Sequence, residues 1–124
     1  MTNILIADDS KTMRMQISNV VRELLDDANI RYAEDGAGVL KAWHDIHPPN
    51  LTILDIHMPV LNGLEVMRHL LASGTKIPKV IIYTASRDDA MRQQCLDAGA
   101  AAVIIKSREN IHEAIRTALQ IPNI

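Results

Sequence analysis

The 124-residue chain is 48% hydrophobic and 23% charged and contains no Phe, which is typical of one globular domain with an aliphatic core. Its formal net charge of −2, with Lys and Arg scattered along the sequence, argues against direct nucleic-acid binding, and the lone Cys95 excludes an internal disulfide. Because no apolar run reaches the length of a membrane span and no secretion signal opens the chain, we expect a cytoplasmic protein without membrane contact.

The first strand and helix are predicted at the start of the chain. Residues 3–7 form an apolar run that predicts a strand, and the polar residues 8–10, Asp-Asp-Ser, end it. Apolar residues then recur at helical spacing from Met13 to Leu24. This pattern predicts a helix, with Ser10 as its N-cap.

The second strand and helix have weaker signals. Residues 30–33 predict a short strand. The helix after it has one apolar face, formed by Val39, Trp43 and Ile46. We expect this helix to end at Pro48-Pro49, because proline cannot continue a helix.

The third strand, residues 51–55, is a continuous apolar run that ends on Asp55. Runs of this kind are typical of strands buried on both faces of a parallel sheet. Two further strands are predicted over residues 79–84 and 101–105. Apolar positions at helical spacing predict the helices after these three strands: Leu64, Met67, Leu70, Leu71, Met91, Cys95, Ala98, Ile111, Ile115, Ala118 and Leu119. The residues expected to begin or end these helices are Asn62-Gly63, Gly74, Gly99 and Pro122.

Five strands thus alternate with five helices, without internal repeats. This alternation predicts an α/β fold with three layers, in which helices cover both faces of a doubly wound, five-stranded parallel sheet. We expect the flavodoxin-like strand order 2-1-3-4-5 and a single domain over residues 1–124.

Polar residues follow or end four of the predicted strands: Asp8, Asp9, Asp55, Thr84 and Lys106. Each has an ordinary explanation alone, as a helix N-terminal acid, a β-branched strand residue or a solvated strand end. Together they lie at the carboxyl edge of one parallel sheet, where the three carboxylates converge. Two carboxylates about 4 Å apart repel by roughly 4 kcal/mol at an effective dielectric near 20, so the cluster favours a bound cation. All-oxygen ligation favours Mg²⁺, whereas His44 and His47 are interpreted as solvated residues near a helix end rather than zinc ligands.

These residues also resemble a known family. The motifs Asp8-Asp9, Asp55-Ile56-His57-Met58-Pro59, Gly63, Thr84-Ala85 and Lys106 are similar to those of receiver domains of two-component response regulators. The resemblance covers essentially the whole chain. It implies that Asp55 accepts a phosphoryl group from a phosphohistidine on a histidine kinase or a phosphotransfer protein.

The resemblance also implies roles for the other site residues. Asp9, Asp55 and the backbone carbonyl of His57 would hold Mg²⁺, with Asp8 acting mostly through water. Thr84 and Lys106 would bind the phosphoryl oxygens. The side chains of His57 and Ser86 are candidates for tuning the lifetime of the phosphoryl group.

Two positions depart from the family pattern. Lys106 is usually followed by Pro across a cis bond, but Ser107 stands here. The family also tends to carry Tyr or Phe three residues before the Lys, where this chain has Val103. The family's coupling of Thr movement to an aromatic rotamer is therefore in question. Tyr83 is either a substitute for that aromatic residue or a packing residue.

The implied function is a signalling switch that catalyses only its own phosphorylation and dephosphorylation. Its output surface would comprise the fourth helix, the fifth strand and the fifth helix. That surface would contact a downstream effector protein or a C-terminal output domain not present in this chain, as a monomer or a phosphorylation-dependent dimer.

Three other interpretations agree less well with these residues. A flavin carrier of the same fold should have Gly, Ser and Thr in its first loop, where Asp8-Asp9 would repel phosphate. A hydrolase working through an aspartyl-phosphate should have an alternating acid pair and a cap domain. A receiver used only for docking should lack a site residue, and none is missing here.

Overall fold

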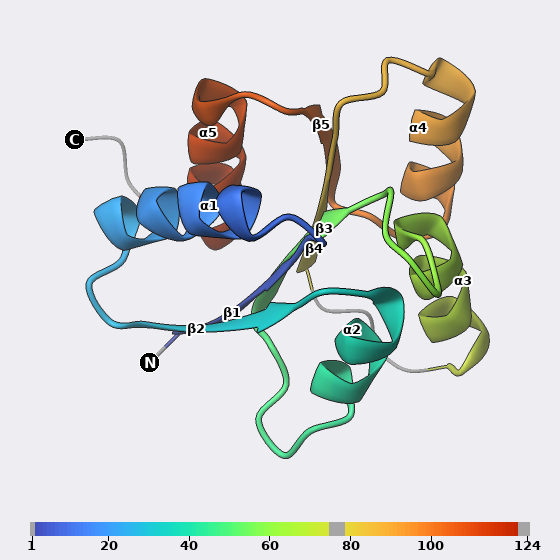
Figure 1. The fold of residues 1–124 in the computed structure, drawn as a ribbon, viewed down its shortest axis with the longest axis horizontal. Helices are drawn as coiled ribbons and strands as arrows, with labels where there is room; N and C mark the ends of the chain where they lie inside the picture. The colour runs from blue at the N-terminus through green and yellow to red at the C-terminus, as the bar shows by residue number, and fades with distance from the viewer. Residues whose placement is uncertain (1, 75–78, 122–124) are drawn as a thin grey trace.

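In the computed structural model, which describes residues 2–74 and 79–121, five parallel strands form one sheet (Figure 1). The strands are β1 (Thr2–Ala7), β2 (Ala28–Ala33), β3 (Leu51–Asp55), β4 (Lys79–Thr84) and β5 (Ala102–Ile105). Their order in the sheet is β2-β1-β3-β4-β5. The predicted parallel sheet and its strand order are therefore confirmed.

Helices cover both faces of this sheet. The helices are α1 (Lys11–Leu24), α2 (Gly36–Trp43), α3 (Gly63–Ala72), α4 (Asp89–Asp97) and α5 (Arg108–Leu119). In Figure 1, α1 and α5 lie together on one face, and α2, α3 and α4 lie on the other. This three-layer arrangement requires strands that are apolar on both faces, which is why β1, β3 and β4 read as continuous apolar runs.

Successive residues of each central strand pack into different cores. Ile4 and Ile6 of β1 contact the core under α1 and α5, whereas Leu5 and Ala7 contact the core under α2, α3 and α4. The same alternation holds in β4, because side chains of a strand point to opposite faces in turn. The alternation determines which face each residue beyond the strand ends can reach.

The helix starts follow the predicted caps. The Ser10 side chain accepts a hydrogen bond from the Met13 N–H at 3.3 Å, which confirms it as the N-cap of α1. Asn62 caps α3 and forms a capping box with Glu65. Both helices therefore begin at fixed residues directly after the loops that carry the site.

The predicted end of α2 is wrong. The helix ends at Trp43, well before Pro48-Pro49, and Ile46 lies beyond it with 87% of its surface exposed. The Asp45 carboxylate accepts a hydrogen bond from the Ile46 N–H at 2.7 Å and pairs with Arg31 of β2 at 2.9 Å. The bond to the Ile46 N–H competes with helical bonds, and the Arg31 pair holds Asp45 to β2, so the helix stops before the prolines are reached.

Other boundaries differ by one or two residues. β2 begins at Ala28 instead of residue 30, because Ala28 and Asn29 pair with Thr2 and Asn3 of β1. β5 begins at Ala102 instead of residue 101.

The predicted helix ends at the two glycines are confirmed. Gly74 and Gly99 follow α3 and α4 with φ of +70° and +107°, a left-handed conformation that glycine adopts without strain. Pro122, predicted to stop the last helix, lies outside the described residues.

Candidate phosphoacceptor and metal site

The predicted polar residues meet at the carboxyl edge of the sheet. Asp8 and Asp9 follow β1, and Asp55 ends the neighbouring strand β3. One carboxylate oxygen from each of these three residues lies within 4.8 Å of the others. The convergence expected from the parallel topology is thus present in the structure.

Asp8 is fixed by bonds to three parts of the chain. It is 1% exposed, and its carboxylate accepts a hydrogen bond from the Ser10 N–H at 2.9 Å. Its own N–H donates to the Ala33 carbonyl at 3.1 Å. The Arg14 guanidinium donates to the Asp8 carbonyl at 2.8 Å. The loop that carries the neighbouring Asp9, whose side chain is exposed, is therefore held in place from both sides.

Asp55 is a buried carboxyl group whose ionised form is disfavoured. It is 4% exposed, and burial raises the pKa of Asp55 above its ordinary value of 3.8. The His57 N–H, which donates to the carboxylate at 3.2 Å, lowers this pKa, while the nearby Asp8 raises it and Lys106 lowers it. The net shift of the Asp55 pKa is upward, so an additional cation would stabilise the charged carboxylate.

Lys106 reaches the acid cluster although Ser107 follows it. Its ammonium lies 3.5 Å from carboxylate oxygens of both Asp8 and Asp55. The described residues contain no cis peptide bond, so Lys106 and Ser107 are joined in trans. Ser107 is the N-cap of α5 and accepts a hydrogen bond from the Asn110 N–H at 3.1 Å. The missing Pro has therefore not displaced the lysine from the carboxylates.

Tyr83 is a packing residue that also contacts Lys106. The Tyr83 side chain is 4% exposed in the core under α1 and α5, and burial raises its pKa. The Lys106 ammonium lies over its ring, 5.5 Å from the centroid. Of the two interpretations drawn from the sequence, the structure supports packing.

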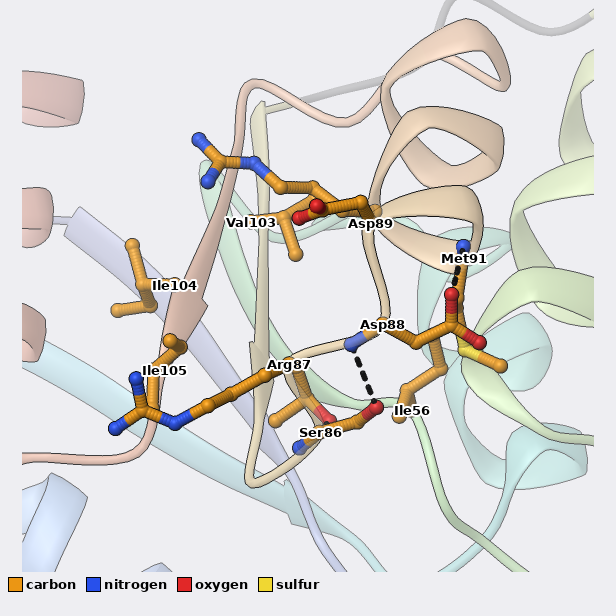
Figure 2. Close-up of a pocket in the computed structure, with 11 residues that line it drawn as sticks. Ile56, Ser86, Arg87, Asp88, Asp89, Met91, Val103, Ile104 and Ile105 are labelled. Carbon is orange, nitrogen blue, oxygen red and sulfur yellow. Dashed lines mark hydrogen bonds between the residues drawn. The ribbon is translucent and has the colours of Figure 1, made fainter.

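Thr84 ends β4, and its hydroxyl is tied to the loop that follows. The hydroxyl oxygen accepts a hydrogen bond from the Ser86 N–H at 3.0 Å, and the Ser86 hydroxyl accepts one from the Asp88 N–H at 3.2 Å. Figure 2 shows this loop beside Val103, which lines a hollow of about 190 Å³ together with Thr84. No aromatic side chain stands among the described residues that line it, so the smaller Val103 leaves this space open.

Sequence reasoning missed the structural roles of three residues that support the site. Arg14 holds the Asp8 carbonyl, Ser107 caps α5 behind Lys106, and Gly63 packs where an added Cβ would lie 2.9 Å from the Asp55 carbonyl oxygen. Ser107 had a readable signal, since serine before a helical pattern predicts an N-cap. Arg14 and Gly63 act through contacts with the backbone of Asp8 and Asp55, and these contacts become visible only in the folded structure.

The donor set fits a hard divalent cation. The cluster consists of carboxylates, two of them buried, with the single Lys106 ammonium near Asp8 and Asp55. Carboxylate oxygens are the ligands that Mg²⁺ prefers, and a cation would relieve the repulsion among them. The site is therefore compatible with Mg²⁺.

The fold and the site together define a class of protein. It is a flavodoxin-like α/β domain with clustered carboxylates and a lysine at the edge of its sheet. A family model described as "Response regulator receiver domain" matches residues 4–116. The chain belongs to this family of two-component signalling proteins, whose receiver domains are signalling switches.

Individual relatives agree with this assignment. The chain is 37% identical over 112 residues to the protein CcdB of Bacillus subtilis, covering 88% of each. It is 34% identical over 115 residues to BvgA of Bordetella pertussis, covering 93% of this chain and 53%, or about half, of BvgA. Among solved structures, it is similar to the CheX-CheY-BeF₃-Mg²⁺ complex from Borrelia burgdorferi, with a TM-score of 0.82, 25% identity and coverage of 95% of this chain and 89% of that chain.

No helix within the described residues is both long and apolar enough to cross a membrane.

Proposed function

We propose that this receiver domain is switched when Asp55 accepts a phosphoryl group from a phosphohistidine on a histidine kinase or a phosphotransfer protein. One Asp55 oxygen forms the new O–P bond as the P–N bond of the phosphohistidine breaks. The electron pair of that bond stays on the imidazole nitrogen, which takes up a proton from solvent. The observation that carries the proposal is a buried Asp55 carboxylate that shares the Lys106 ammonium with a second buried carboxylate, Asp8.

The neighbouring residues have complementary proposed roles. Asp8, Asp9 and Asp55, with the backbone carbonyl of His57, would hold Mg²⁺, which when bound neutralises charge on the phosphoryl oxygens. The Lys106 ammonium, already 3.5 Å from Asp55, would bind one phosphoryl oxygen. The Thr84 hydroxyl would bind another. A cation is required because the carboxylates of the cluster repel one another and would also repel the phosphoryl oxygens.

The added phosphoryl charge supplies the switch. It attracts the Thr84 hydroxyl, which is bonded to the Ser86 N–H, so movement of Thr84 moves the loop after β4. This biases the face formed by α4, β5 and α5, which a downstream effector or an output domain would read. The Borrelia complex, which contains CheX, CheY, BeF₃ and Mg²⁺, supports binding of a partner protein by a similar chain. The chain would act as a monomer or as a phosphorylation-dependent dimer.

Acetyl phosphate tests this proposal directly. With Mg²⁺ present, we expect intact-mass spectrometry to show one added phosphoryl group on the protein, and none after a chelator removes the metal. Asp55→Asn should remain unlabelled, because its amide cannot act as the acceptor. Asp26→Asn, at an exposed site, should be labelled like the parent protein. Labelling that persists in Asp55→Asn would contradict the assignment.

The lifetime of the phosphoryl group gives a second prediction. The His57 side chain is exposed and lies two residues after Asp55, where it would hinder the water that attacks the phosphoryl group. We therefore expect His57→Ala to lose its label several-fold faster after the donor is removed, as followed by mass spectrometry. Ser86→Ala should have a smaller effect, because the Ser86 hydroxyl is already bonded to the Asp88 N–H. An unchanged decay in His57→Ala would exclude this role.

A further inference from the structure

Tyr83 lies on the path that Lys106 takes to the acid cluster. In the sheet register, Asp55 of β3 is paired with Tyr83 of β4, and Tyr83 is paired with Ile104 of β5. Lys106 comes two residues after Ile104, and side chains two residues apart leave a strand on the same face. Because β4 lies between β5 and β3, the lysine crosses β4 to reach Asp55, and Tyr83 is the β4 residue paired with Asp55.

The contacts of Lys106 agree with this path. Its ammonium lies 5.5 Å from the centroid of the Tyr83 ring while it approaches Asp8 and Asp55 to 3.5 Å. The Lys106 side chain is only 24% exposed, so water screens these contacts little. A cation within about 6 Å of an aromatic face is attracted to it, and more strongly when it is desolvated.

The Tyr83 ring is itself buried. It is 4% exposed and packs in one core cluster with Ile17 of α1 and Ile111 of α5. The backbone at the start of the lysine is fixed too, because the Lys106 N–H donates to the Thr84 carbonyl at 2.8 Å and Ser107 caps α5. The buried ring thus lies near the ammonium end of Lys106, while the backbone of the lysine is held by these bonds.

We propose that Tyr83 is a positioning residue for Lys106, whose ring holds the ammonium between Asp8 and Asp55. The consequence for phosphoryl transfer rests on the proposed function, in which this ammonium binds a phosphoryl oxygen. An aliphatic residue would fill the same core space without attracting the cation. The aromatic ring, and not the bulk of the side chain, is therefore what the site uses.

The position of the lysine can be measured without any phosphoryl donor. Protons near the face of an aromatic ring shift upfield in NMR spectra. We expect the ε-methylene signal of Lys106, assigned with Lys106→Met, to be shifted upfield in the parent protein and in Tyr83→Phe. It should return to the usual lysine position in Tyr83→Leu and Tyr83→Met. A signal at the usual position in the parent protein would overturn the proposal.

Phosphorylation by acetyl phosphate then tests the consequence. Tyr83→Phe should be labelled at nearly the parent rate, whereas Tyr83→Leu and Tyr83→Met should be labelled about 3- to 10-fold more slowly, the size expected for loss of one cation–π contact. In a Lys106→Met background, removing the ring should slow labelling no further. Two results would overturn the positioning role. One is that Tyr83→Leu slows labelling as much in the Lys106→Met background as in the parent protein. The other is that Tyr83→Leu does not slow labelling of the parent protein at all.

The two measurements separate this proposal from the function on which it rests. If the parent protein shows the upfield lysine signal but acetyl phosphate never labels Asp55, the proposed function fails and the lysine–ring contact stands. If labelling occurs normally and the lysine signal is not shifted, the positioning role fails and the function stands.

Discussion

Asp55→Asn is expected to increase the free energy of unfolding at neutral pH when divalent cations are absent. Asp8 and Asp55 are 1% and 4% exposed and lie at equal distances from the Lys106 ammonium, so the buried negative charge exceeds the positive charge beside it. The amide retains an oxygen for the His57 N–H but removes the charge that burial disfavours. The gain should be on the order of 1 kcal/mol, a common size for single-site effects.

The pH dependence of this difference has a definite sign. Burial, followed by the charge of Asp8, raises the pKa of Asp55 in the folded protein above its ordinary value of 3.8, against the opposing His57 N–H and Lys106. The folded state therefore binds the proton more tightly than the unfolded state, and the stability of the parent protein falls as the pH rises from 3.8 through the folded-state pKa. The advantage of Asp55→Asn should be largest above that window and vanish below it.

Urea unfolding followed by the fluorescence of Trp43, the single and buried tryptophan, measures both proteins. Addition of Mg²⁺ should stabilise the parent protein more than Asp55→Asn, because a ligand that binds the folded state shifts unfolding by mass action and the variant lacks one carboxylate. Asp26→Asn, at an exposed position, should change stability by less than about 0.5 kcal/mol. An Asp55→Asn protein less stable than its parent at neutral pH without metal would refute the electrostatic account.

The acid cluster was predictable because it depends on topology alone. Asp55 ends an uninterrupted apolar run, and only a strand covered on both faces requires such a run. Once the strands are parallel and adjacent, the residues after β1 and β3 must meet at one edge, whatever their side-chain conformations. Asp8, Asp9 and Asp55 could therefore be placed together without knowledge of any single contact.

The remaining features depend on pairwise contacts that a linear pattern does not contain. The early end of α2 follows in part from the bond between Arg31 of β2 and Asp45 of the loop after α2, which lie 14 residues apart. The contact between Lys106 and Tyr83 required the register of β4 against β5 as well as the direction of a long, flexible side chain. Sequence periodicity predicts which residues are buried but not which side chains contact each other. It therefore placed the acidic residues at the sheet edge without predicting the contacts around them.

Gly63→Ala is expected to destabilise the fold and displace the site together. Gly63 is the first residue of α3, and its N–H donates to the Ile56 carbonyl at 2.9 Å. An added Cβ would lie 2.9 Å from the Asp55 carbonyl oxygen and 3.0 Å from the Ile56 Cα, both backbone atoms that no rotamer change can move aside. Relief of this clash requires the end of β3 and the start of α3 to separate, which should cost about 1–3 kcal/mol of unfolding free energy.

Because the same separation shifts Asp55 relative to Asp8 and Lys106, Gly63→Ala should also slow labelling by acetyl phosphate on the order of tenfold or more under conditions where it remains folded. Gly38→Ala is the matched control in α2: its Cβ would lie 3.3 Å from the Ala33 Cβ, so the neighbouring strand has to move by only a few tenths of an ångström. Alanine is favoured over glycine within a helix by about 1 kcal/mol, which offsets this tight contact, so the control should retain both stability and labelling rate. Equal urea midpoints for Gly63→Ala and its parent would show that the backbone beside Asp55 can move without a cost in stability. The position of Asp55 would then depend on the bonds of its carboxylate to His57 and Lys106.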